Sequence, residues 1–112
     1  MAKKTLIRNS LVQDAFGKYL VNNNYTSKTV NTYLSSMRTI TRYLREDHII
    51  DRDIYDLTRS GLKDAFDSLV ENEEFVDKDS KSGYKYSHAF THYCDFIDCM
   101  TDYLNDQYLL VY

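Results

Sequence analysis

The sequence predicts an all-α protein, a compact bundle of four to five helices that forms one domain over residues 1–112. Three observations indicate this class. Proline is absent and glycine numbers only 3, so the chain lacks the residues that usually separate the strands of all-β folds. Four segments repeat apolar side chains every three or four residues, which is the period of an amphipathic helix. A length of 112 residues suits one domain with a hydrophobic core of its own.

The first predicted helix begins at Ser10, which can cap it, and follows a basic N-terminal arm, residues 1–9. Its expected core side chains are Leu11, Val12, Ala15, Phe16, Tyr19 and Leu20. The helix is expected to end at residues 22–24, all asparagine, because asparagine tolerates the left-handed conformation at a helix terminus.

The second predicted helix starts at Thr26 or Ser27 and has the clearest periodicity in the chain. Its apolar stripe is spaced 3, 4, 3 and 4 and consists of Val30, Tyr33, Met37, Ile40 and Leu44. Such spacing places all five side chains on one side of a helix, which is therefore predicted to face the core.

The second half of the chain predicts two more helices. Residues 47–56 are expected to form a loop or short turn, and residues 72–83 a polar, charged loop. Between these loops, a helix capped by Thr58 or Ser60 carries Leu62, Ala65, Phe66, Leu69 and Val70. The last helix, residues 86–105, turns Ala89, Tyr93, Phe96, Ile97, Met100 and Leu104 inward. An apolar tail, residues 106–112, is expected to dock on the bundle or to pair two copies of the chain.

Composition excludes several classes of protein. No apolar run approaches the roughly 18 residues that a membrane helix needs, and the first ten residues lead into no signal-peptide core. A cytoplasmic protein is therefore expected, with no membrane contact. Cys94 and Cys99 are five residues apart, a spacing typical neither of a zinc knuckle nor of a disulfide within a helix, so two free, buried thiols are expected.

No catalytic or metal site is predicted. The sequence contains no nucleophile elbow, phosphate loop or HExxH motif. His88, His92, Asp95 and Cys99 could share one face of the last helix, but one helix rarely supplies a complete zinc site. We therefore expect a protein that is not an enzyme and that carries no cofactor.

The net charge of −3 conceals two oppositely charged parts of the chain. Residues 1–46 contain eight basic and two acidic residues, a net charge of +6. Residues 47–112 contain six basic and fifteen acidic residues, a net charge of −9. This division indicates different partners for the two parts, or attraction between them.

The polar side of the second predicted helix combines cations with small hydrogen-bonding side chains. Its spacing of 3, 4, 3, 4 and 3 places six residues on one face, opposite the apolar stripe: Lys28, Asn31, Ser35, Arg38, Arg42 and Arg45. Guanidinium and ammonium groups bind phosphates, and Ser and Asn permit close approach. The pattern favours a duplex DNA surface, and the plain alternative is an ordinary solvated helix face.

The acidic part of the chain suggests a different partner. Its candidate surface consists of Glu73, Glu74, Asp77, Asp79, Tyr84 and Tyr86. Carboxylates in a cluster can imitate nucleic acid and occupy the groove of a basic nucleic-acid-binding protein, while exposed tyrosines are enriched at protein interfaces. The plain alternative is a solvated loop.

Several short motifs resemble a known family. They are Phe16-Gly-Lys-Tyr-Leu20, Ser27-Lys-Thr29 followed by Tyr33, Ile54-Tyr-Asp-Leu-Thr58, and Tyr84-Lys-Tyr86-Ser-His-Ala89. Together they resemble the SAM-like N-terminal core-binding domain of tyrosine recombinases and phage integrases, over about residues 11–100. The resemblance implies a helical bundle whose second helix helps to form a DNA-facing surface. The Arg, His-x-x-Arg and nucleophilic Tyr cluster of the recombinase catalytic domain has no counterpart in this sequence, so recombination chemistry is not expected.

These observations lead to one primary prediction, one alternative, and a third interpretation in which the chain is an assembly module that dimerises through its apolar tail. The primary prediction is a non-catalytic module, encoded by a phage or another mobile element, that binds DNA phosphates through the second helix. The alternative is an inhibitor of a host nuclease or defence system, of the anti-CRISPR kind, that binds a protein through the acidic, tyrosine-rich part.

Overall fold

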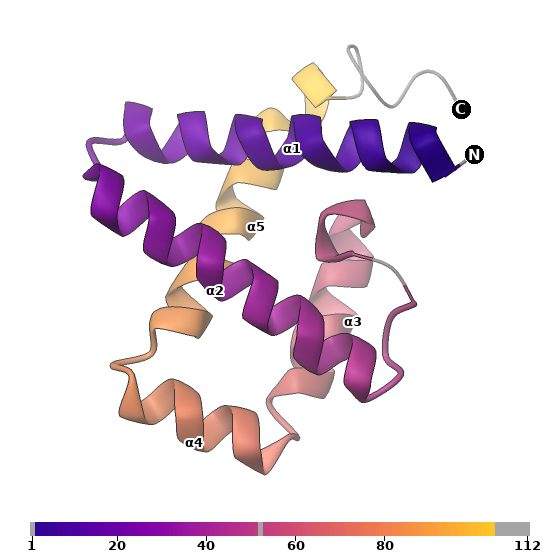
Figure 1. Cartoon of the computed structure of the whole chain (residues 1–112), viewed down its shortest axis with the longest axis vertical. Coiled ribbons are helices and arrows are strands. Elements are labelled where there is room, and N and C mark those ends of the chain that lie inside the picture. Colours follow the sequence, from indigo (N-terminus) through magenta and orange to yellow (C-terminus); the bar gives the residue numbers. More distant parts are fainter. Residues whose placement is uncertain (1, 52, 105–112) are drawn as a thin grey trace.

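The computed structural model is built from helices (Figure 1). It describes the backbone of residues 2–51 and 53–104, and the side chains of residues 11–51 and 53–99. Its elements are α1 (Ala2–Asn22), α2 (Ser27–Glu46), the short 3-10 helix η1 (Ile54–Asp56), α3 (Arg59–Leu69), α4 (Glu73–Lys81) and α5 (Lys85–Leu104). No strand occurs among the described residues, so the predicted all-α class is confirmed. No helix in that part of the chain combines the length and the apolar character needed to cross a membrane.

The other helices pack around α2. Its N-terminus is capped by Thr26, whose Oγ1 accepts a hydrogen bond from the Thr29 amide at 3.2 Å. Three side chains of the predicted apolar stripe, Met37, Ile40 and Leu44, are each 0% exposed. In Figure 1, α5 passes behind α2, and these two helices share the most extensive contact between described elements. The prediction for this helix and its buried side is therefore confirmed.

Aromatic rings join α1 and η1 to α5. The rings of Phe16 and Tyr93 meet edge to face with centroids 5.2 Å apart, and Tyr55 is perpendicular to Tyr93 at the same distance. Phe96 lies 5.5 Å from Phe16. Asp53 positions Tyr55 by accepting a hydrogen bond from its amide at 3.0 Å. The short turn predicted between the second and third helices is thus present, and it contributes to the core.

The predicted boundaries of the first helix are correct only at its end. α1 begins at Ala2, so the predicted start at Ser10 is wrong. No glycine or proline precedes Ser10 to stop the helix, and most of those residues favour helical conformation. α1 ends at Asn22, and Asn24 has a φ of 70°, the left-handed conformation expected there. The predicted tail, residues 106–112, lies outside the described residues.

Two residues predicted to be in the core, Leu11 and Val70, are exposed instead. Leu11 is rotated by about 100° around the helix axis from the buried Val12. Val70 is the cap residue that follows the last residue of α3, Leu69, so the helical period no longer directs its side chain inward. Periodicity therefore located the buried side of both helices but not the residues at its margins.

α4 replaces the polar loop predicted for residues 72–83, so that prediction is wrong. Asn72 caps the helix by accepting a hydrogen bond from the Phe75 amide at 3.0 Å. Two glutamates in the first turn and two lysines in the last turn complement the helix dipole. Phe75 is the buried apolar anchor. One such residue is too few to produce a recognisable apolar repeat.

Asp79 links the end of α4 to the start of α5 through hydrogen bonds. It is only 5% exposed, and its Oδ1 accepts hydrogen bonds from the amides of Tyr86 and Ser87, both at 3.1 Å. Its Oδ2 accepts a further hydrogen bond from the Ser87 hydroxyl. The Asp79 carbonyl accepts one from the Tyr84 amide at 2.8 Å. The carboxylate thus satisfies amides in the first turn of α5 that have no partner within the helix.

Replacing Asp79 with alanine is expected to lower the free energy of unfolding by about 2 kcal/mol, because two amides and a hydroxyl lose their acceptor. Asp77→Ala is the matched control, since it removes an exposed carboxylate of the same helix whose ion pair with Lys81 contributes little. Urea denaturation followed by circular dichroism measures both effects. Equal losses of stability in the two variants would contradict the role assigned to Asp79.

Candidate nucleic-acid interface

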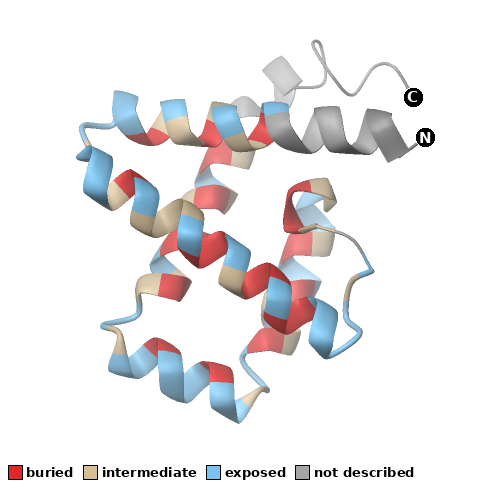
Figure 2. Cartoon of the chain, in the orientation of Figure 1, coloured by how far each residue is buried: buried red, intermediate tan, exposed pale blue. Residues whose placement is uncertain are grey.

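The six polar residues predicted on the second helix lie on one side of α2, and all six are exposed. We call this surface the α2 polar face; it consists of Lys28, Asn31, Ser35, Arg38, Arg42 and Arg45. At 1.5 Å of rise per residue it extends about 25 Å along the helix. Figure 2 shows exposed and buried stretches alternating along α2, as expected for a helix with one covered side.

The charges of the α2 polar face are weakly neutralised. The Arg42 Nε lies 3.9 Å from a carboxylate oxygen of Glu46, and both side chains are more than half exposed. Such a pair contributes little and leaves the guanidinium free to bind elsewhere. Burial raises the pKa of Tyr55, and the negative charge of Asp53 raises it further. The positive charge of Arg38 lowers it.

Two lysines from the acidic part of the chain extend this basic surface. The Lys78 Nζ lies 5.9 Å from the ring centroid of Tyr43 and 5.8 Å from that of Tyr86. The Lys85 Nζ lies 5.1 Å from the Tyr86 centroid, and the Arg42 guanidinium 5.6 Å from that of Tyr43. Neither lysine is recognisable from the sequence as part of this surface, because only the fold brings α4 and the start of α5 beside α2.

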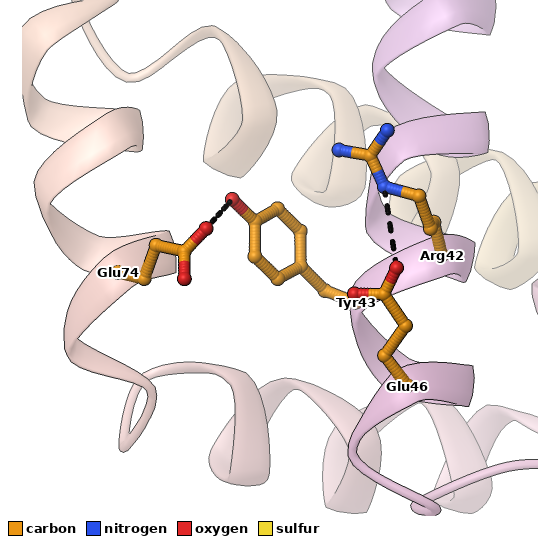
Figure 3. Close-up of polar contacts among 4 residues, drawn as sticks. All are labelled: Arg42, Tyr43, Glu46 and Glu74. Atoms are coloured by element: carbon orange, nitrogen blue, oxygen red, sulfur yellow. Dashed lines mark hydrogen bonds and ion pairs between the residues drawn. The ribbon is translucent and has the colours of Figure 1, made fainter.

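Acidic groups limit the basic surface where α4 docks against the C-terminal half of α2. The Tyr43 hydroxyl donates a hydrogen bond to Glu74 at 3.3 Å (Figure 3). Burial raises the pKa of Tyr43, the charge and hydrogen bond of Glu74 raise it further, and Arg42 lowers it. The Asn72 amide donates to the Asp47 carboxylate at 2.8 Å. The positively and negatively charged parts of the chain therefore meet at this edge.

The acidic surface considered as an alternative is only partly exposed. Four of its six residues are accessible: Glu73, Glu74, Asp77 and Tyr84. Asp79 is buried because it caps α5, and Tyr86 is buried because it packs 6.1 Å from Phe75. The prediction that these two residues lie on an open surface is therefore wrong.

The histidines and cysteines of α5 do not converge on one site. His92 lies between two tyrosines, with its Nε2 3.2 Å from the Tyr25 hydroxyl and its ring 5.1 Å from that of Tyr33. Cys94 is half-buried, but Cys99 is exposed because a separation of five residues turns it to another side of the helix. The expectation of a buried thiol is thus wrong for Cys99. Among the described residues, no group of three or more His, Cys, Asp or Glu side chains could hold a metal ion.

Glu74→Gln is expected to lower the pKa of Tyr43 towards its ordinary value of 10.0, because glutamine keeps a hydrogen-bond acceptor but removes the negative charge. The pKa stays somewhat raised because the ring remains buried. Since the folded-state pKa is the higher one, the stability linked to Tyr43 is complete below about pH 10 and is lost as the pH rises through the folded-state value.

An NMR pH titration of the Tyr43 ring measures this change. Glu73→Gln is the matched control, because Glu73 is an exposed neighbour and is not one of the groups that shift the Tyr43 pKa. An identical Tyr43 titration in both variants would contradict the assigned contact.

Comparison of the chain with protein-family models, with curated proteins and with solved structures found no match. The resemblance to integrase core-binding domains therefore rests on the motifs quoted above.

Proposed function

We propose that this protein is a non-catalytic module that binds duplex DNA through the α2 polar face. The observation that carries the proposal is the exposure of all six side chains of this face along one helix. Four of them are cations, and two are small hydrogen-bonding side chains that lie between the cations. A row of like charges complements the regularly spaced phosphates of a duplex.

The chemistry of this face suits phosphates better than base edges. The guanidinium groups of Arg38, Arg42 and Arg45 can each donate paired hydrogen bonds to phosphate oxygens, while Lys28 supplies a point charge. The small Ser35 side chain lets the DNA backbone come close. Contacts of this kind position a protein on the duplex without reading its sequence, and their affinity falls steeply with salt.

The net charge of −3 does not oppose this proposal. The potential that a duplex meets is set by nearby groups, because exposed charges are screened beyond about 10 Å at 0.1 M salt. The nearby acids are at one end of the face, where Glu46 pairs with Arg42 and Glu74 bonds the neighbouring Tyr43. Three of the four cations nevertheless lie in the C-terminal half of α2, so the potential of the face is expected to remain positive there.

The resemblance to integrase core-binding domains points in the same direction. It implies a bundle that holds DNA while another domain performs the chemistry. On this basis, the protein belongs to a phage or another mobile element, and it contributes binding rather than catalysis.

Arg38→Gln combined with Arg42→Gln is expected to weaken duplex binding and to flatten its dependence on salt. Loss of two phosphate contacts should reduce the slope of log affinity against log salt by about 1.8. Lys63→Gln combined with Lys81→Gln is the matched control, because it removes the same charge from exposed lysines outside the face. Fluorescence anisotropy with a labelled duplex, at several salt concentrations, measures all three proteins.

Failure of the unmodified protein to bind at about 50 mM salt would contradict the proposal, as would equal slopes for the two double variants. The protein-inhibitor alternative makes the opposite prediction for α4. Replacing Glu73 and Glu74 with lysine should strengthen duplex binding if DNA is the partner. The same change should abolish binding to a basic protein if the acidic residues form the interface.

A further inference from the structure

A polar pocket of about 330 Å³ lies between the first half of α2 and the start of α5. Its walls include Lys28, Asn31 and Ser35 from the α2 polar face, together with Lys85 from α5. The volume is within the range of roughly 300–1,000 Å³ that small-ligand sites occupy. Two cations from distant parts of the sequence therefore share one space large enough for a small ligand.

Some of the polar groups in the pocket are already occupied, and others are free. The Thr32 hydroxyl donates to the Lys28 carbonyl at 3.0 Å, and the Ser36 hydroxyl donates to the Thr32 carbonyl at 2.8 Å. Within the described part of the chain, Asn31 and Ser35 make no side-chain hydrogen bond, and neither lysine of the pocket has a carboxylate within ion-pair distance. The Lys85 ammonium lies over the Tyr86 ring, a contact that leaves its hydrogen-bond donors available, so two cations and two neutral donors can serve a ligand.

The backbone favours an anion here but does not supply the binding groups. Lys28 is the second residue of α2, so the pocket lies near the positive end of that helix dipole. The start of α5 is closed to a ligand, because the Asp79 carboxylate already accepts from the amides of Tyr86 and Ser87. An anion in the pocket must therefore be held mainly by side chains.

We propose that this pocket binds a phosphate group, held by the ammonium groups of Lys28 and Lys85 and by hydrogen bonds from Asn31 and Ser35. The source of the phosphate rests on the proposed function: it is one backbone phosphate of the bound duplex. Lys85 then extends the DNA contact from α2 to α5. A phosphate held between two helices fixes the orientation of the bundle on the DNA, which contacts along a single helix do not.

A phosphate fits this arrangement better than a carboxylate. Its non-bridging oxygens can accept from donors on both walls of the pocket at once. Lysine binds either anion as a point charge, so the preference rests on the larger number of phosphate oxygens that the two walls can contact at once. The pocket contains lysines and no arginine.

Titration of isotopically labelled protein with inorganic phosphate, at constant ionic strength, tests the pocket without DNA. Saturable NMR shifts are expected at the amides of residues 28–36 and 85–87. Lys85→Gln is expected to weaken phosphate binding about fivefold, the upper range for an ion pair open to solvent. Lys63→Gln is the matched control, because Lys63 is an exposed lysine that lines a different groove, between α3 and α5. Amide spectra of both variants verify that they are folded.

The same variants are then tested with duplex DNA. Lys85→Gln should reduce the slope of log affinity against log salt by about 0.9, because one phosphate contact is lost. The proposal is supported if Lys85→Gln both weakens the phosphate-induced shifts at the pocket and reduces the slope of log affinity for the duplex against log salt. Duplex binding that depends on Arg38 and Arg42 but not on Lys85, with no phosphate shifts at the pocket, overturns the pocket and leaves the proposed function intact. Phosphate binding at the pocket without any duplex binding supports the pocket as a site for a free phosphate and overturns the proposed function.

Discussion

The packing of α2 against α5 determines which side chains of this protein can meet a partner. Met37, Ile40 and Leu44 are each completely buried, and exposing one such side chain costs roughly 1.5–3 kcal/mol. Rotation of α2 about its axis would expose several of them at once, so the opposite side of the helix has to face outward. The cations of the α2 polar face lie on that opposite side. One periodic pattern therefore stabilises the core and orients the proposed DNA surface.

The acidic part of the chain is divided among structural roles rather than gathered into one surface. Asp79 is buried and caps α5, and Asp53 caps η1. Glu74 bonds Tyr43 at the edge where α4 meets α2, and Asp77 pairs with Lys81 on the same helix. Because so many carboxylates have partners within the fold, the large negative charge of this part of the sequence is a weak guide to function. It also explains how a basic surface persists on a protein with a net negative charge.

The sequence was sufficient to predict elements that depend on a repeated pattern, and insufficient for those that depend on single residues. The buried side of α2 and its polar face follow from spacing alone, whereas the turn at Asn24 follows from the residue type. α4 was not predicted because it depends on the Asn72 cap, one buried phenylalanine and the bonds of Asp79, none of which produces periodicity. Lys78 and Lys85 were not identified as part of the candidate surface because their positions beside Tyr86 depend on how three helices pack. The spacing of residues in the sequence thus predicted the α2 polar face, whereas Lys78 and Lys85 join it only through the packing of the helices.

Mapping a short DNA duplex onto the folded protein by NMR tests whether the exposed side of α2 is the surface that meets DNA. If it is, amide shifts are expected to be concentrated from Lys28 to Arg45 and at the start of α5. Little change is expected at the exposed residues of α4, including Glu73 and Asp77. Shifts centred on α4, or the absence of localised shifts at low salt, would contradict this role of α2.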